Sequence, residues 1–148
     1  MIAYPSIAVI KNIEVTGGMR YVWNADTGQY EKNGVSSKVG AVILTVGIVD
    51  TSGYHPVDKT ELYRLKSQTA TTAMAAESIP VSNWVKVKED NGKVTAMQDT
   101  LDDAYPSAGE HVWYRLVTTH GPFTRTGVPV EAADLFHVPS TVSFLDAH

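Results

Sequence analysis

The sequence predicts an all-β fold, an antiparallel β-sandwich that forms one domain with an extension at each end. Three observations predict it. The 148-residue chain contains 19 valines and 15 threonines, nearly a quarter of its residues, and both types favour strands over helices. Its strand-like runs are short and are separated by turn signals roughly every 8–12 residues, which is typical of sandwiches and barrels. Helical segments do not alternate with these runs, so a parallel α/β fold is disfavoured.

The first predicted elements are a strand and a hairpin. Residues 7–15 (I-A-V-I-K-N-I-E-V) form the strand, which ends at a glycine pair. Residues 20–24 and 29–33 each carry aromatic side chains and flank the turn A-D-T-G at 25–28. Two such runs around a short Asp/Gly turn predict a β-hairpin.

The most apolar segment covers residues 38–50. Apolar side chains occur on both of its alternating faces, which predicts a central strand that is also covered on its second face. A loop at 51–56 precedes a short strand at 60–66. Residues 67–78 are rich in alanine and threonine without an apolar stripe, so we expect a loop with at most one or two helical turns.

The remaining strands are separated by turns that contain Gly, Asp, Asn or Pro. They are predicted at residues 83–89, 94–101, 109–121, 123–130 and 141–145. The strand at 109–121 alternates most regularly. The face predicted to point into the core carries Val112, Tyr114, Leu116 and Thr118. The opposite face carries His111, Trp113, Arg115, Val117 and Thr119.

Four of these segments together resemble a fibronectin type III domain. T-E-L-Y-R-L-K at 60–66 is similar to strand C of that family, and N-W-V-K-V at 83–87 to the strand that follows. M-Q-D-T at 97–100 is similar to its Thr-Asp-Thr turn, and A-G-E-H-V-W-Y-R-L-V-T at 108–118 to strand F. The resemblance implies an immunoglobulin-like sandwich.

The resemblance also implies boundaries. It covers residues 35–130, with residues 38–50 as strand B, and leaves 1–34 as an N-terminal strand and hairpin extension and 131–148 as a C-terminal arm. The sequence departs from the family at Val112, which occupies the tyrosine-corner position, and in an enlarged loop after strand C.

The register that the resemblance implies creates an apolar outer face. Trp113 and Val117 share it with Tyr63 and Leu65 of the neighbouring strand, and Arg115 lies between them. Such a face needs a cover, which we expect to be either the N-terminal hairpin or a protein partner, because clusters of Trp, Tyr and Arg are typical interface hot spots. The candidate partner-binding residues are Tyr63, Leu65, Trp113, Arg115, Val117, Tyr21 and Trp23.

Composition and charge argue against several classes of function. Charged residues make up 19% of the chain and the formal net charge is −4, which is not the basic footprint of a nucleic-acid or anionic-membrane binder. The absence of cysteine excludes disulfides and thiolate metal sites. The N-terminal residues do not resemble a signal peptide, and no apolar run approaches the ~18 residues that span a bilayer.

Weak catalytic and metal-binding signals each have a simpler explanation. D-T-G at 26–28 matches the triplet of retroviral-type aspartic proteases, but a hairpin turn explains the same residues. Asp99, Asp102 and Asp103 fit either a solvated acidic turn, which we expect, or a Ca²⁺ site. The five histidines lack metal-binding spacing, and we expect them on the surface. The sequence therefore predicts no enzyme and no catalytic residue, cofactor or metal.

These observations lead to a functional hypothesis that rests on family analogy. We expect a structural or assembly module, such as a capsid decoration or tail-associated protein of a bacteriophage, assembled in the cytoplasm and acting on the virion or outside the cell. Its partners would be copies of itself or other virion subunits, to which the two arms add strands. The alternative is a carbohydrate-binding or adhesion module in which Trp23, Trp84 or Trp113 stacks on a glycan.

Overall fold

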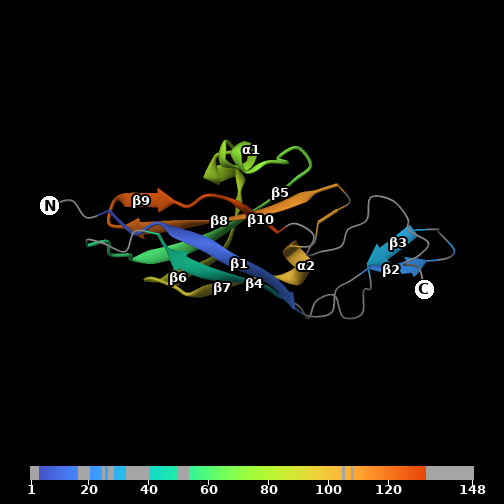
Figure 1. Cartoon of the computed structure of the whole chain (residues 1–148), viewed down its shortest axis with the longest axis horizontal. Helices are drawn as coiled ribbons and strands as arrows, with labels where there is room; N and C mark the ends of the chain where they lie inside the picture. The colour runs from blue at the N-terminus through green and yellow to red at the C-terminus, as the bar shows by residue number, and fades with distance from the viewer. Residues whose placement is uncertain are drawn as a thin grey trace.

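Two antiparallel β-sheets pack face to face in the computed structural model of the chain, which confirms the predicted all-β sandwich (Figure 1). The structure describes residues 4–16, 21–24, 26, 29–32, 41–49, 54–104, 106–107 and 109–132, with the side chains of 16, 21–24, 29–32 and 102 left undescribed. The predicted strand at 141–145 lies outside this part of the chain. Within it, no helix is long and apolar enough to cross a membrane.

One sheet has the strand order β1-β4-β7, and the other has the order β10-β8-β5-β6, with β9 paired to β8 on the same side as β10. The first sheet contains β1 (Ala8–Thr16), β4 (Ala41–Ile48) and β7 (Ala96–Thr100). The second contains β5 (Lys59–Ser67), β6 (Val85–Asn91), β8 (His111–His120), β9 (Phe123–Thr126) and β10 (Val130–Glu131). A separate hairpin joins β2 (Tyr21–Asn24) to β3 (Gln29–Lys32), as predicted.

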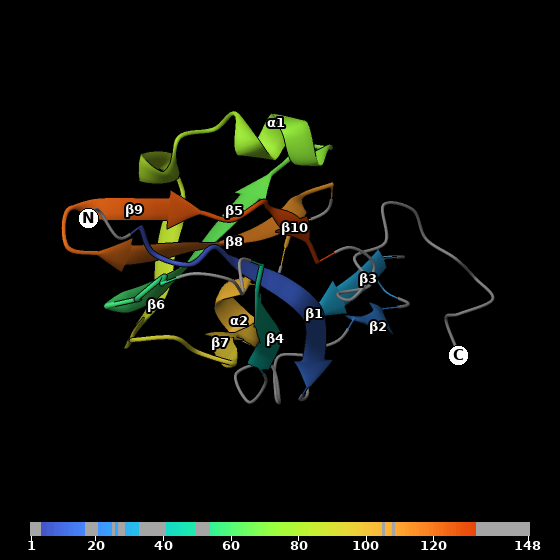
Figure 2. The same ribbon diagram turned by 60° about the vertical axis from the view of Figure 1, so that its left-hand side comes forward.

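Three short helical segments complete the described fold. These are α1 (Ala73–Glu77), the 3-10 turn η1 (Val81–Asn83) and α2 (Leu101–Ala104). The single five-residue α1 confirms the prediction for residues 67–78. In Figures 1 and 2, α1 lies outside the sheet that contains β5 and β8, on the side away from β1, β4 and β7.

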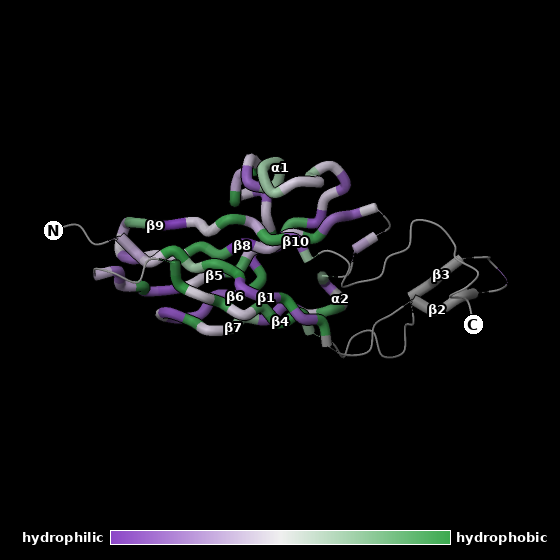
Figure 3. Tube along the Cα trace, in the orientation of Figure 1, coloured by the Kyte–Doolittle hydropathy of each residue, from purple (hydrophilic) through white to green (hydrophobic). Residues whose placement is uncertain are grey.

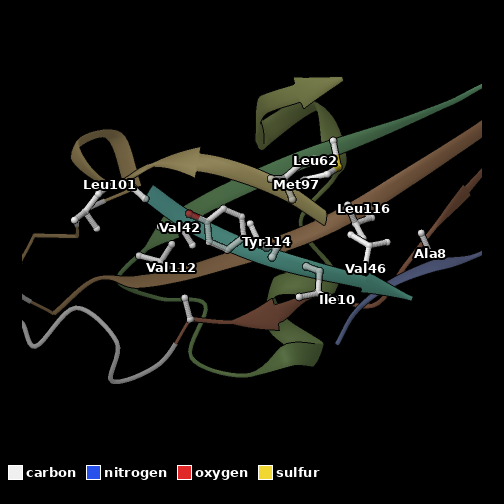
Figure 4. Packing of buried hydrophobic residues seen from close by; sticks show 13 residues of the cluster. Ala8, Ile10, Val42, Val46, Leu62, Met97, Leu101, Val112, Tyr114 and Leu116 are labelled. Carbon is white, nitrogen blue, oxygen red and sulfur yellow. The ribbon is translucent and has the colours of Figure 1, made fainter. Parts of the chain in front are cut away.

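The main core lies between the two sheets, and β8 contributes its predicted face. Val112, Tyr114 and Leu116 are fully buried there, which confirms that prediction. Hydrophobic residues recur along the strands of both layers (Figure 3). Figure 4 shows the packing of this cluster, to which the other strands and α2 contribute Ala8, Ile10, Val42, Leu44, Val46, Leu62, Met97 and Leu101.

Strand β1 is a full member of the sandwich and contains a β-bulge. Its register against β4 shifts between Ile10 and Asn12, so that Lys11 is the extra residue. The bulge reverses the alternation, and Ile13 and Val15 pack against the same core as Ile10. The predicted boundary at residue 35 is therefore wrong for β1, because this strand is paired within the first sheet rather than in an extension.

One lateral side of the sandwich is closed by a close backbone approach. A Cβ added to Gly127 would lie 2.3 Å from the carbonyl oxygen of Ala8, so only glycine fits here. The Gly127 N–H donates to the Leu116 carbonyl at 2.8 Å. The chain leaves the regular ladder at this point, and the single strand predicted for 123–130 is instead divided into β9 and β10.

The second face of β4 is only partly covered among the described residues. Ile43 is half-buried, whereas Thr45 and Val49 are exposed. Gly47 lies beneath the Lys11 side chain, whose Cδ is 2.3 Å from the position of an added Cβ. The predicted cover of this face is therefore present over Ile43 and Gly47 and absent at Thr45 and Val49 among the described residues.

Candidate functional site

The outer face of β5 and β8 is covered by the chain itself, through the segment that joins β5 to β6. We call residues 68–84 the covering segment. Its Ala70, Ala76 and Trp84 form a second buried cluster with Trp113 of β8. Tyr63, Leu65, Ala75 and Ile79 pack around this cluster and are partly buried.

Hydrogen bonds fix the covering segment on the sheet. Trp113 Nε1 donates to the carbonyl oxygen of Ala70 at 2.7 Å, and Trp84 Nε1 donates to that of Ile79 at 3.2 Å. Thr72 caps α1, because its Oγ1 accepts from the Ala75 N–H at 3.1 Å. Both indole N–H groups are thereby satisfied in a buried environment.

Arg115 is buried beneath the covering segment and beside the closed side of the sandwich. Its Nε and Nη2 donate to the Gly127 carbonyl at 3.2 and 3.1 Å, and its guanidinium lies 5.3 Å from the centre of a Trp84 ring. Burial lowers the pKa of Arg115, while the charge of Glu77 acts in the opposite direction. The Gly127 carbonyl and the Trp84 ring compensate part of the desolvation of this charge.

This arrangement changes what the predicted partner-binding residues can do. Trp113, Arg115 and Val117 are only 4%, 6% and 7% exposed, so these three side chains are already covered within the described residues. The covering segment packs on Trp113 and, through Trp84, on Arg115, and it is a cover that we did not expect. Tyr63 and Leu65 lie half-buried at the margin. The side chains of Tyr21 and Trp23 lie outside the described part of the chain.

Two of the three tryptophans predicted to stack on a glycan are also buried. Trp84 is as deeply buried as Trp113 in the second cluster, so neither ring face is open to a sugar. The side chain of Trp23 is not among those described. The geometry therefore provides no sugar-stacking tryptophan within the described residues.

A cluster of hydrogen-bonded polar side chains, which we did not predict from the sequence, lies between the two sheets. Arg64 Nη1 of β5 is 2.6 Å from Oδ2 of Asp99 in β7, and Tyr114 Oη of β8 donates to the same oxygen at 2.8 Å. The Thr100 N–H donates to the other carboxylate oxygen at 2.8 Å. Burial raises the pKa of Tyr114, and the neighbouring Asp99 charge raises it further, so the phenol stays protonated as a donor.

The Asp99 environment corrects the prediction of a solvated acidic turn. Asp99 is buried in an ion pair, whereas Asp103 is exposed at the end of α2 and accepts from Thr100 Oγ1 at 2.8 Å. Among the described residues, no group of three or more His, Asp or Glu side chains is arranged to hold a metal ion.

A groove of about 430 Å³ opens on the lateral side opposite Gly127, between β6 and β7. We call it the lateral groove. Arg64 and Asp99 form part of its lining, and the exposed Val85 and Lys88 lie on the β6 side. Its complete lining is Ala41, Arg64, Val85, Lys86, Val87, Lys88, Gln98, Asp99, Thr100 and Asp103.

Exposed aromatic side chains gather at the end of the sandwich where the N-terminal segment lies. Tyr4, Val49 and Tyr54 are 47%, 57% and 73% exposed, and we call this surface the aromatic end. The Tyr4 ring lies 4.7 Å from that of Phe123, in the turn region after β8. His55, next to Tyr54, donates from Nδ1 to the Tyr4 carbonyl at 3.1 Å.

Further hydrogen bonds hold the loops of the aromatic end in place. Ser6 Oγ donates to the His55 carbonyl at 3.1 Å, and the Val49 N–H donates to the Ile7 carbonyl at 3.1 Å. Exposed apolar surface on a loop framework that is tied to the sandwich is typical of a recognition surface.

Asp58 fixes the β8–β9 turn at this end. Its carboxylate accepts from the Gly121 N–H at 2.7 Å and from His120 Nδ1 at 3.1 Å. The hydrogen bond from Gly121 lowers the pKa of Asp58, and the one from His120 lowers it further. Gly121 has a φ of 56°, which is the left-handed conformation that this turn requires.

The histidines of the described residues have structural partners. His55 bonds the Tyr4 carbonyl, His111 bonds Glu131, and His120 bonds Asp58. All three are half-buried rather than fully on the surface, where we expected them. The two remaining histidines lie outside the described residues.

Asp26 of the protease-like triplet lies where the hairpin prediction placed it. Asp26 is exposed in the turn between β2 and β3, and the other two residues of the triplet are outside the described part.

Compared with family models, curated proteins and solved structures, the chain matches none of them significantly.

Proposed function

We propose that this chain is a non-catalytic β-sandwich module that works by assembling with protein subunits, in the first place copies of itself. The aromatic end carries the proposal. Of the six large hydrophobic side chains that are exposed in the described residues, Tyr4, Val49 and Tyr54 lie on segments that hydrogen bonds join to one another at this end. Tyrosines on a rigid framework bury much area at a low entropic cost, and exposed aromatic clusters are typical of protein interfaces.

The strand order supports the family part of the proposal. Immunoglobulin-like sandwiches place strands A, B and E in one sheet and strands C, F and G in the other. With β4 as B, β5 as C and β8 as F, as the resemblance implies, β1 is A, β7 is E, and β9 and β10 together are G. β6 then takes the C′ position beside β5. We propose a fibronectin type III-like sandwich on this basis.

The proposed biological setting is a virion, as a capsid decoration or tail-associated protein of a bacteriophage. This part of the proposal rests on the family analogy, because sandwiches of this kind are common in such proteins. The exposed aromatic end fits that setting, since a subunit of an assembly works through protein contacts and not through a reaction.

Sedimentation velocity at micromolar concentrations tests the proposal. We expect the full chain to sediment as a species larger than its 16.1 kDa monomer, with a size that depends on concentration. The Tyr54→Ser variant should shift the equilibrium toward the monomer. Met74→Ser is the matched control, because Met74 is 83% exposed but lies on α1, away from the aromatic end.

Two outcomes would contradict the proposal. One is a full-length chain that remains a monomer over the whole concentration range. The other is an oligomer that Met74→Ser weakens as much as Tyr54→Ser does, since the aromatic end would then have no special part in the contact. Circular dichroism of each variant verifies that the fold is retained.

A further inference from the structure

The two lateral sides of the sandwich differ, and the difference exposes one strand edge. On one side, Gly127 lets the chain between β9 and β10 approach Ala8 of β1 closely. On the other side, the lateral groove separates β6 from β7. Among the described strands, β7 pairs only with β4, so its second edge borders the groove.

The two edges that border the groove differ in their protection against strand addition. β6 carries Lys86, Lys88, Glu89 and Asp90, and its register against β5 shifts at Val87, which marks a bulge. Charges and bulges are the usual means of protecting an edge. The β7 side chains beside the groove are the uncharged Gln98 and Thr100, together with Asp99, which is turned inward to Arg64. The edge of β7 is therefore the one suited to accept a strand.

The groove specifies what an added strand must present. A strand placed beside β7 continues the first sheet, so alternate side chains point into the groove and the others point to solvent beside Gln98. The inward side chains would meet Val85 and Val87 and should be apolar. Lys86 on the opposite lip is already paired with Glu61 and Glu89, and Asp103 also lines the groove. Charge therefore sets only a weak preference, for a segment without lysine or arginine beside Lys88.

One segment of this chain has that pattern. Residues 141–145 read T-V-S-F-L, with apolar Val142 and Phe144 alternating with polar Thr141 and Ser143. The chain after residue 132 contains Asp134 and Asp146 and neither lysine nor arginine. The alternation of residues 141–144 matches the groove, and this part of the chain brings no lysine or arginine to Lys88.

We propose that residues 141–145 of a second copy of this chain add a strand to the free edge of β7, with Val142 and Phe144 in the lateral groove. The inference rests on the proposed assembly function and adds a second contact to the one at the aromatic end. A second copy is favoured over the same chain by the sheet order. β10, from which the C-terminal arm leaves, is at one edge of its sheet, and β6, which borders the groove, is at the other.

Disulfide trapping in the full-length chain tests the inference directly, because the natural sequence has no cysteine. We would mix a Gln98→Cys chain with a Ser143→Cys chain under mild oxidation and follow dimers on non-reducing gels. Facing residues on paired strands are ~4.5–5.5 Å apart at Cα, which suits a disulfide. Thr100 and Thr141 each lie two residues from a member of the first pair, so they point to the same outward side. Mixtures that contain Thr100→Cys or Thr141→Cys repeat the measurement with the added strand shifted by two residues.

The control is Thr45→Cys mixed with Ser143→Cys. Thr45 is also exposed in the first sheet, but β4 is paired on both sides and cannot accept a strand. We expect the Gln98 or Thr100 mixtures to crosslink on the order of a hundredfold faster than the control, because strand pairing raises the effective thiol concentration. Phe144→Asp in the Ser143→Cys chain should abolish this advantage, whereas Thr141→Asp, directed to solvent, should preserve it.

The outcomes separate this inference from the proposed function. Mixtures that crosslink no faster than the control overturn the inference, and sedimentation of the unmodified chain decides independently whether it assembles. A double variant with both cysteines that forms only an internally linked monomer also overturns it, because the arm would then occupy its own groove.

Discussion

Arg64 and Asp99 form an ion pair across the interior of the sandwich, with Nη1 and Oδ2 2.6 Å apart. The partners belong to different sheets, β5 and β7, so the pair ties the two layers together beside the lateral groove. Tyr114 of β8, a third strand, donates a hydrogen bond to the same carboxylate. A buried polar group of this kind fixes how the layers are aligned, provided that every member is satisfied.

Removing the charge of Asp99 should therefore destabilise the fold strongly. Asp99→Asn leaves the Arg64 guanidinium buried without its counter-charge, and breaking one partner of such a pair costs about 3–5 kcal/mol. Urea denaturation followed by tryptophan fluorescence measures the loss. Asp103→Asn is the control, since Asp103 is exposed and should change the free energy of unfolding by less than about 0.5 kcal/mol. Equal effects of the two variants would argue against a structural role for the ion pair.

Tyr114 should make the stability of the fold depend on alkaline pH. Burial raises the pKa of Tyr114 above its usual value of 10.0, so the folded phenol binds its proton more tightly than the unfolded one. Its contribution is therefore fully present below about pH 10 and is lost as the pH rises above that value and the unfolded state ionises. Denaturation midpoints measured between neutral and alkaline pH should fall less steeply in Tyr114→Phe. The same slope in both proteins would contradict this assignment.

Two glycines that appear equally crowded should respond differently to alanine. A Cβ at Gly127 would lie 2.3 Å from the Ala8 carbonyl oxygen, and one at Gly47 would lie 2.3 Å from Lys11 Cδ. The carbonyl belongs to paired backbone and cannot move freely, whereas the lysine side chain can rotate away. We expect Gly127→Ala to cost about 2–3 kcal/mol and Gly47→Ala less than about 1 kcal/mol by thermal denaturation. A reversed order would show that β1 can shift away from Gly127.

Asp58 should titrate at unusually low pH. The Gly121 N–H and, to a smaller degree, His120 lower the pKa of Asp58 from 3.8. Its contribution to the β8–β9 turn is therefore present above the unfolded pKa and is lost as the pH falls through the lower folded pKa. NMR titration of the Asp58 carboxyl carbon measures this. His120→Ala should raise the pKa only partly, because the Gly121 contact remains, and a full return to the ordinary value would reverse the order of the two causes.

The alternation of side chains carried most of the fold prediction. Val112, Tyr114 and Leu116 recur with period two, and this pattern specifies both a strand and its buried face without information from elsewhere in the chain. The bulge at Lys11 is different, because it depends on the register against β4. The alternation of β1 alone does not reveal which residue is extra.

The cover of the outer face could not be predicted from its own sequence. Residues 67–78 lack an apolar stripe, and the side chains that they bury are small, such as Ala70 and Ala76. The large buried residue is Trp84, which the predicted strand at 83–89 included but which precedes β6 in the structure. What makes this segment a cover is the Trp113 indole, whose N–H needs an acceptor and finds it at Ala70, 43 positions earlier.

The Arg64–Asp99 pair left a signal that could have been used. Arg64 lies two residues after the core residue Leu62, and Asp99 lies two residues after the core residue Met97. Each charged side chain therefore falls on the inward face of its strand. Two opposite charges on inward faces of different strands indicate a buried pair. Their partnership depends on the stacking of the sheets, which no local pattern encodes.

The close approach of Gly127 to Ala8 makes the two lateral flanks of the sandwich different from each other. One flank is sealed and the opposite flank is open, so an arm that enters the open flank of a neighbour joins two unlike surfaces. Two copies that exchange arms reciprocally close as a two-fold dimer. An arm passed on to a third copy instead makes a heterologous contact, whose repetition closes into a ring or continues as a filament. A single glycine in the last strand region thus bears on the symmetry of any assembly that these subunits form.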